Sequence, residues 1–428
     1  MKFNVKWLCA LLLGSLLVDA AAAQPAAQSA APAPRAELEA AWDDFQQALA
    51  ECTRFVREHP FYQNEEDRAA AYAYLSAMTL ARIEEDIVFD AGQPFFRVLD
   101  HRIREGGDNP DQRYLIASLK GGERYRVWGT LGSNRRLDLQ VYAGDPFVAG
   151  SGGRSASSIL FEQLQVAPDG SFEVLLSPER QAGNWLENPA DGSSLLVRQI
   201  FSDWKSELPG EVHIDRLGHE GELKPVLDET AMAARLRKAA ADLRVHVKVW
   251  PGMVQRRYLA MPPNTLSAPA DPSALGGVPG RFMASGNFDL APDEALVIRT
   301  WPASGNYQGI QLADLWFSSL EYANRQTSLT ADQAQLAADG SYYFVIAGRD
   351  PGVPNWLDTT GRQRGVILLR FDGVKERTFD PAQHPHATLV KLAQLRDHLP
   401  ADTPRVTPQQ RAAEIAARRQ HVQRRLGI

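Results

Sequence analysis

Two strand-rich blocks of the chain repeat the same order of turns and strands. Segments 169–176 and 339–346 each place an Asp-Gly-Ser turn before an alternating apolar strand. Segments 184–187 and 355–358 then share an Asn-Trp-Leu-acid pattern, and another strand follows in each copy. We therefore expect an internal duplication. It predicts two related antiparallel β-sandwich or jelly-roll units packed together, or one large sandwich to which each copy contributes a sheet.

Helical patterns flank and separate the two blocks. Apolar residues recur at spacings of three and four outside the blocks, whereas inside them the period falls to two. The expected fold class is therefore mainly β with added α. We expect a signal peptide over 1–23, a flexible leader over 24–34, a helical hairpin and connection over 35–105, a first β-sandwich unit over 106–220, a helix and linker over 221–280, a second β-sandwich unit over 281–380, and C-terminal helices over 381–428.

The N-terminus has the pattern of an export signal. Lys2 and Lys6 give the first residues a positive charge, and an apolar run follows over 7–18. The alanines at 21–23 favour cleavage after Ala23. The run is shorter than the roughly 20 residues that a membrane-spanning helix needs. We therefore expect a periplasmic or secreted protein, with a membrane anchor as the alternative. No later segment is long and apolar enough to span a bilayer.

Cleavage at this place would leave Cys52 as the only cysteine, so no internal disulfide is expected. Cys52 shares a helical apolar stripe with Trp42, Phe45, Leu49 and Val56. A cysteine in such a stripe is typically buried and inert, so we predict that Cys52 lies unreactive between the two N-terminal helices. The formal net charge of −6 offers no basic footprint, so no nucleic-acid partner is expected. The sequence does not fix the oligomeric state.

Three segments resemble a known bacterial family. They are 106–111, with Gly-Gly-Asp-Asn-Pro-Asp, 288–296, and 350–361, which is the most specific of the three. The chain resembles the domain-of-unknown-function family 1214 over most of its mature part. The resemblance implies a β jelly roll with helical additions, in agreement with the pattern above, and it brings no agreed activity and no catalytic residue. The first copy departs from the pattern, since 188–192 stands where the second copy has 359–362, so chemistry in the second loop is not expected in the first.

An acidic turn before the first strand is the main candidate for chemistry. Asp108, Asn109 and Asp111 are followed at once by Arg113 and Tyr114. Two nearby carboxylates could share a proton or bind a hard cation, and burial could split their pKa values for acid–base work. The structural alternative is an Asx-type turn that starts the strand. We predict that Asp108, Asp111 and Tyr114 are catalytic, that Asn109 and Arg113 bind ligand, and that this loop borders the main cavity. Because strand residues alternate, Tyr114 rather than Arg113 should face inward.

The Asn-Trp-Leu-acid loops are a second candidate. Trp356 would stack on a sugar ring or a flat apolar ligand, while Asp358 and Arg364, or its neighbour Arg362, would hold polar groups. The structural alternative is a tryptophan that plugs the core and an asparagine that caps a turn. The duplication further predicts that 355–356 closes a loop at the end of one sandwich, and that 184–185 occupies the matching place in the other.

Histidines give weaker signals. His213 and Asp215 would share one face of a strand, as an acid–base pair or as a solvated face. His384 and His386 have no evident third ligand, so no metal site is expected there. The sequence contains no nucleophile elbow, Walker loop, zinc-protease motif or dinucleotide fingerprint, so no cofactor is expected.

Three functions stay open at this point. The first is an exported enzyme that acts on a glycan, lipid or terpenoid-like small molecule by carboxylate and tyrosine acid–base chemistry, through an unspecified lyase, hydratase or hydrolase reaction. The second is a non-catalytic envelope protein that binds similar ligands, and the third is a structural protein of the envelope. A deep pocket holding Asp108, Asp111 and Tyr114 would favour the first. A shallow aromatic groove at Trp356 would favour the second, and a flat apolar face the third.

Overall fold

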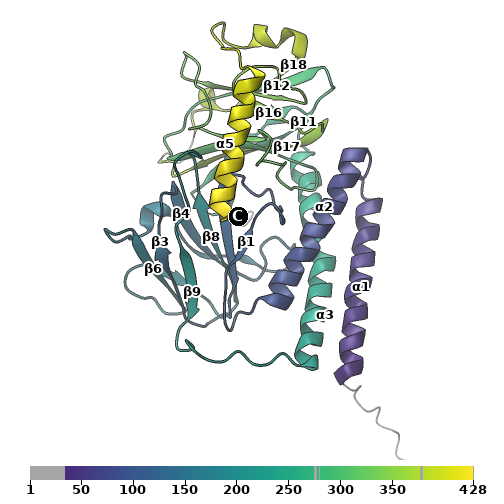
Figure 1. Ribbon diagram of the computed structural model, residues 1–428, viewed down its shortest axis with the longest axis vertical. Helices are drawn as coiled ribbons and strands as arrows, with labels where there is room; N and C mark the ends of the chain where they lie inside the picture. Colours follow the sequence, from purple (N-terminus) through teal and green to yellow (C-terminus); the bar gives the residue numbers. More distant parts are fainter. Residues whose placement is uncertain (1–33, 274–276, 279, 376–378, 428) are drawn as a thin grey trace, which may run out of the picture.

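The computed structural model describes residues 34–273, 277–278, 280–375 and 379–427. Two β units lie one above the other, and long helices run beside them (Figure 1). The protein is therefore mainly β with added α, as the sequence predicts. The predicted signal peptide and the leader up to residue 33 lie outside the described residues.

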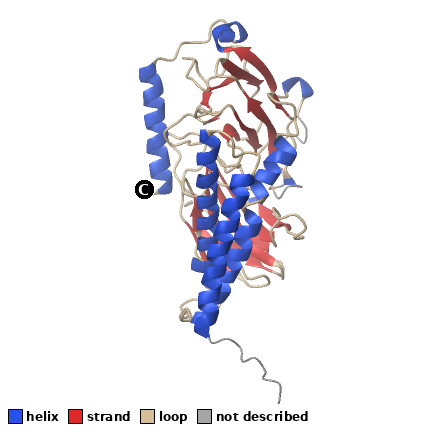
Figure 2. Cartoon of the chain, turned by 90° about the vertical axis from the view of Figure 1, so that its right-hand side faces the viewer, coloured by secondary structure: helices blue, strands red, loops and turns tan. Residues whose placement is uncertain are grey.

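The helical layer combines the N-terminal hairpin with a helix from the middle of the chain (Figure 2). Asn64 starts the second helix of the hairpin, because its side chain accepts a hydrogen bond from the backbone N–H of Asp67. In chain order the elements are α1 (Pro34–Glu58), α2 (Glu65–Arg82), the π-helix η1 (Ile83–Val88), α3 (Glu229–His246), α4 (Val249–Met253) and the π-helix η3 (Val254–Tyr258).

The buried face of α1 differs from the predicted stripe. Cys52 is buried, as predicted, whereas Trp42 and Leu49 are exposed and small alanine side chains take part in the buried face instead. The Cys52 sulfur lies 3.7 Å from the carbonyl oxygen of Leu243, so α3 also packs against Cys52, a contact that the sequence did not predict. Burial raises the pKa of the Cys52 thiol to about 11.

The first β unit is a sandwich of two sheets around its own apolar core. One sheet has the order β1 (Arg97–Leu99), β2 (Gln112–Ser118), β8 (Gly192–Ile200), β4 (Arg136–Ala143) and β5 (Arg154–Ile159). The other has the order β7 (Trp185–Glu187), β6 (Ser171–Ser177), β3 (Tyr125–Thr130) and β9 (Val212–Arg216), and the short helix η2 (Phe161–Gln163) follows β5 in the chain.

The second β unit has the same strand order in both sheets, again around its own core. One sheet runs β10 (Thr265–Leu266), β11 (Phe282–Asp289), β17 (Arg364–Asp372), β13 (Tyr307–Ala313) and β14 (Ser328–Thr330). The other runs β16 (Trp356–Asp358), β15 (Tyr342–Ala347), β12 (Glu294–Thr300) and β18 (His386–Lys391). Each strand of the second unit therefore occupies the position of one strand of the first, so that β10 corresponds to β1 and β18 to β9, which confirms the duplication.

The predicted match between the two Asn-Trp segments is confirmed. Asn184 and Asn355 each exchange two hydrogen bonds with the backbone of a glutamine upstream, Gln165 in one unit and Gln335 in the other. The tryptophan that follows begins a short strand, β7 or β16, which pairs in parallel with β6 or β15. Three strands, β1, β10 and β18, lie in segments that the sequence predicts as helical or linking.

The C-terminal segment binds the two units together. After η5 (Pro381–Gln383) and η6 (Leu392–His398), α5 (Pro408–Leu426) runs along both units (Figure 1). Near its start Arg411 pairs with Asp350 of the second unit at 2.9 Å. Near its end the ring of His421 stacks on Trp204, which follows β8 of the first unit. The helix α5 thus contacts both units and stabilises their arrangement. The main cavity lies near the boundary between the two units.

Candidate functional site

A cavity of about 1000 Å³ lies where the first unit, the helical layer and the second unit meet. The strand β2 forms part of its wall because its side chains alternate. Leu115 and Ala117 point into the sandwich core, whereas Tyr114 and Ile116 point out into the cavity. The outer face of this sheet is therefore covered by the helices and the second unit, and not by solvent alone.

Aromatic rings form a continuous wall of the cavity. Neighbouring ring centroids lie 5.0 to 6.1 Å apart along the series, distances typical of favourable aromatic pairs. The rings come from β4, from the loop after it, from the end of the helical layer and from the second unit, in the order Tyr142, Phe147, Trp250, Phe317 and Tyr258. The wall suits a flat or ring-bearing apolar molecule.

A double glycine lets the backbone approach this wall. Gly106 and Gly107 have positive φ angles of 68° and 63°. A Cβ atom would lie 2.9 Å from the Trp250 ring at the first position and 2.6 Å from the Phe317 ring at the second. Phe317 itself has a φ of 65°, which is unusual for a bulky residue, and its carbonyl accepts a hydrogen bond of 2.7 Å from the Gly107 N–H. Backbone strain of this kind collects at functional sites.

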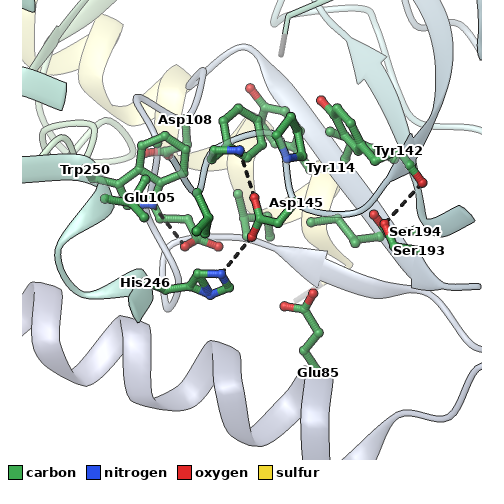
Figure 3. A pocket seen from close by; sticks show the side chains of 18 of the residues that line it. Glu85, Glu105, Asp108, Tyr114, Tyr142, Asp145, Ser193, Ser194, His246 and Trp250 are labelled. Atoms are coloured by element: carbon green, nitrogen blue, oxygen red, sulfur yellow. Dashed lines mark hydrogen bonds and ion pairs between the residues drawn. The ribbon is translucent and has the colours of Figure 1, made fainter. Parts of the chain in front are cut away.

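The glycines place Asp108 at the cavity (Figure 3). Its two carboxylate oxygens accept hydrogen bonds from the backbone N–H of Ser319 at 2.9 Å and from the Ser319 hydroxyl at 2.7 Å. Burial raises the pKa of Asp108 to about 6, although the bonds from Ser319 oppose the rise. The carboxyl group can therefore carry or release a proton near neutral pH.

Tyr114 also faces the cavity, as the alternation predicts (Figure 3). Its hydroxyl accepts a hydrogen bond of 3.0 Å from the backbone N–H of Asn109. The phenolic proton is thus left to donate to a ligand. The position predicted for Asp108 and Tyr114 is confirmed, and their catalytic role stays a prediction.

The other three residues of the acidic turn point elsewhere. The hydroxyl of Tyr307 in the second unit donates to Asp111 at 2.8 Å and accepts from the Asn109 side chain at 2.8 Å. Arg113 donates to Gln199 at 3.2 Å on the face of β2 away from the cavity. Asp108 and Asp111 therefore do not act as a pair, and the predicted role of Asp111 in the cavity is corrected. Its side chain joins the two units instead.

The residues predicted around the second Asn-Trp loop do not line the cavity. Trp356 is buried in β16, where its indole N–H donates to the Ala347 carbonyl at 3.0 Å and the Arg411 guanidinium lies 5.3 Å from its ring. Asp358 forms an ion pair of 2.8 Å with Arg325, and Arg364 lies 3.9 Å from Asp67. The structural alternative holds for this loop, because the ring face that would stack on a ligand is already covered.

A histidine–aspartate pair at the cavity escaped the sequence prediction. Nε2 of His246, the last residue of α3, lies 2.7 Å from a carboxylate oxygen of Asp145 in the loop after β4 (Figure 3). The other oxygen of Asp145 accepts from the Phe147 N–H at 2.8 Å, which fixes the carboxylate. Burial and the nearby Arg82 lower the pKa of His246, against the effect of Asp145. A neutral imidazole held by a carboxylate is suited to accept a proton.

Charged groups on the helical side of the cavity are paired. Burial would raise the pKa of Glu85, but Arg82 and Arg97 lower it to about 2, with ion pairs of 2.7 and 3.3 Å. Arg235 pairs with Asp90 at 2.9 Å. These groups stabilise one another and do not require a charged ligand.

The remaining histidine candidates lie outside this site. On β9, the ring of His213 stacks on Trp128 at 4.4 Å, and the Trp128 indole donates to Asp215 at 2.6 Å on a partly exposed face. The described ranges contain no group of three or more His, Cys, Asp or Glu side chains placed to hold a metal ion. No helix within the described part of the chain is long and apolar enough to cross a membrane.

Comparisons with known proteins give a family and a fold. Residues 113–202 match the family model described as "Protein of unknown function (DUF1214)". The crystal structure of an uncharacterized protein from Burkholderia cenocepacia is 30% identical, with a TM-score of 0.77, over 84% of this chain and 99% of that chain. The VPA0106 protein from Vibrio parahaemolyticus is 12% identical, with a TM-score of 0.41, over 75% of this chain and 98% of that chain. No curated protein matches the chain.

Proposed function

Because this chain belongs to the family described as "Protein of unknown function (DUF1214)", a description that assigns no activity, we propose its function from the cavity itself. The proposal is an exported enzyme that takes a lipid or terpenoid-like small molecule into the cavity and acts on it by acid–base chemistry. The observation that carries it is the placement of Asp108, Tyr114 and His246 on one cavity of about 1000 Å³.

The size and lining of the cavity favour an apolar substrate. Small-molecule sites typically have volumes of roughly 300–1000 Å³, an apolar or aromatic lining and a few polar groups. The aromatic wall defined above meets this description, with Trp250 and Phe317 beside the acidic turn. Of the substrate classes that the sequence left open, a lipid or terpenoid-like body fits this wall better than a glycan with polar groups on every side.

The polar groups can supply an acid and a base. His246, neutral and oriented by Asp145, would take a proton from the substrate or from water. Asp108, with a pKa of about 6, would return one, and the Tyr114 hydroxyl would donate a hydrogen bond to a developing negative charge. Addition or removal of water at a double bond needs such an acid and base and no nucleophilic side chain. A hydratase or lyase reaction therefore agrees with the groups present.

A second candidate is non-catalytic binding of the same class of ligand. It is favoured by the two Ser319 hydrogen bonds, which already satisfy both oxygens of Asp108. A carboxyl group held in this way would serve as a fixed part of the wall. The two candidates differ in whether a bound molecule is converted.

Export remains part of the proposal and rests on the N-terminal sequence. The positive residues, the short apolar run and the small residues before position 24 support it. Mass spectrometry of the protein recovered from the periplasm or medium of a bacterial host should find a chain that begins at Gln24. A full-length chain retained in the cell would contradict export.

To test the proposed function, the protein is purified from its natural host and the small molecules that it retains are extracted. The extracted molecules are identified by mass spectrometry and incubated with the wild-type protein, with His246→Gln and with the control His213→Gln, whose histidine lies outside the cavity. We expect conversion by the wild type and the control, and a loss of about 100-fold or more with His246→Gln, the usual scale for a general base. Retention without conversion would select the binding function, and an empty cavity would overturn both.

A further inference from the structure

Two arginines occupy equivalent positions of the two units and line the same cavity. Arg198 lies in β8 and Arg370 in β17, its counterpart in the duplication. Arg198 donates to the side-chain oxygen of Gln140 at 2.9 Å, and Arg370 donates to that of Gln311. The two glutamines are themselves equivalent, because β4 and β13 pair with β8 and β17 in the same register.

Among the described residues, both arginines donate hydrogen bonds only to neutral groups. The second bond of Arg198 goes to the Tyr142 hydroxyl at 3.2 Å, and that of Arg370 goes to the Gly107 carbonyl. Neither guanidinium forms an ion pair with a described carboxylate, whereas Arg281 in the same wall is held by Asp372 at 2.7 Å. Arg198 is buried and Arg370 is half-buried, and Arg370 acts on Asp108 only through space, where it lowers the pKa of that carboxyl group. A guanidinium in such surroundings whose direct partners are all neutral is stabilised when an anion binds to it.

Both arginines act electrostatically on the hydroxyl of Tyr114. Tyr114 stands directly opposite Arg198 in the pairing of β2 with β8. Burial raises the pKa of the Tyr114 hydroxyl, and Arg370 and Arg198 are the two charges that oppose the rise most. Each guanidinium has five N–H donors, and groups in the described ranges accept hydrogen bonds from two of its nitrogens, so donors remain for a ligand.

The geometry points to an anion subsite formed by Arg198, Arg370 and Tyr114 that holds the carboxylate of a ligand whose apolar body lies against the aromatic wall. This inference names the substrate class of the cavity and rests on the proposed function. A singly charged carboxylate is favoured over a doubly charged phosphate, because Asp108 lies on the same cavity and would repel a second negative charge. A planar carboxylate also matches the fork of a guanidinium.

Matched fluorescent probes test the head group without identifying the natural ligand. The mature protein is titrated with 1-pyrenebutyrate, with 1-pyrenebutanol and with a pyrenebutyl-trimethylammonium salt, which share one aromatic body. We expect the wild type to bind the carboxylate at least tenfold more tightly than the alcohol, and the cation most weakly. Arg198→Gln and Arg370→Gln should each reduce the preference for the carboxylate over the alcohol about tenfold. Arg235→Gln, which removes a cavity arginine already paired with Asp90, should leave the preference unchanged.

Each outcome separates the subsite from the proposed function. Equal affinities of the wild type for the carboxylate and the alcohol would overturn the subsite and leave the apolar cavity standing. Failure to bind any of the three pyrene compounds would overturn both. The wild-type comparison needs no variant, so it decides the question even if Arg198→Gln does not fold. An equal loss of preference in Arg235→Gln would show that the general charge of the cavity, and not this subsite, selects the head group.

Discussion

Replacing Gly107 by alanine should destabilise the protein more than the same change at Gly340. Both glycines have a left-handed backbone, with φ angles of 63° and 78°. A residue with a Cβ atom in this conformation costs roughly 1–2 kcal/mol at either position. At Gly340 nothing lies within 4 Å of an added Cβ, whereas at Gly107 the Cβ would lie 2.6 Å from the Phe317 ring. Overpacking of this kind costs a further ~1–3 kcal/mol.

The two variants should therefore differ in their free energies of unfolding. We expect a loss of about 2–5 kcal/mol for Gly107→Ala and about 1–2 kcal/mol for Gly340→Ala. Urea unfolding followed by tryptophan fluorescence measures both losses. Because Phe317 must move, Gly107→Ala should also weaken binding of 1-pyrenebutanol, and Gly340→Ala should not. Equal losses at the two glycines would refute the reasoning that the double glycine exists to bring the acidic turn against the aromatic wall.

Two further predictions concern buried groups. Cys52 should react with 5,5′-dithiobis(2-nitrobenzoate) much more slowly in the native protein than in urea, since burial raises the pKa of its thiol to about 11. Rapid modification of the native protein would contradict the packing of Cys52 against α3. Burial raises the pKa of Asp108 from 3.8 to about 6, so the folded state holds a proton that the unfolded chain releases between these values. The free energy of unfolding should therefore fall as the pH rises from about 4 to 6, and less so in Asp108→Asn. Urea unfolding at pH 4 and 7 checks this, and an undiminished fall in the variant would exclude Asp108 as its source.

Local patterns account for the parts of the fold that the sequence predicted. Alternation within short segments indicated the strands, and their repeated order indicated the duplication. The same alternation placed Tyr114 in the cavity and Arg113 on the opposite face. These predictions succeed because the direction of a side chain along one strand depends only on its neighbours in sequence.

Contacts between distant segments account for the rest. Asp111 points away from the cavity because it meets Tyr307, which lies 196 residues further along the chain. His246 reads in the sequence as the end of a helix, and only the packing of α3 beside the first unit brings it to Asp145. No periodicity within a segment encodes such a meeting. The sequence could have predicted the equivalence of the two arginines, since aligning the two copies places Arg198 over Arg370.

Comparing the two copies shows which cavity residues they share and which occur in one copy alone. The arginine–glutamine pair occurs in both units, so each half can contribute to an anion subsite. The position in β11 that corresponds to Tyr114 holds Met283, since each stands opposite the arginine of its own unit. Counting back along the chain from this pair places Gly277 where the first unit has Asp108. Of the groups proposed to transfer protons, Asp108 and Tyr114 thus come from the first copy and His246 from α3, while both copies supply positive charge. A ligand held by its carboxylate between the two arginines would therefore present one defined side to Asp108 and Tyr114, as a stereospecific reaction requires.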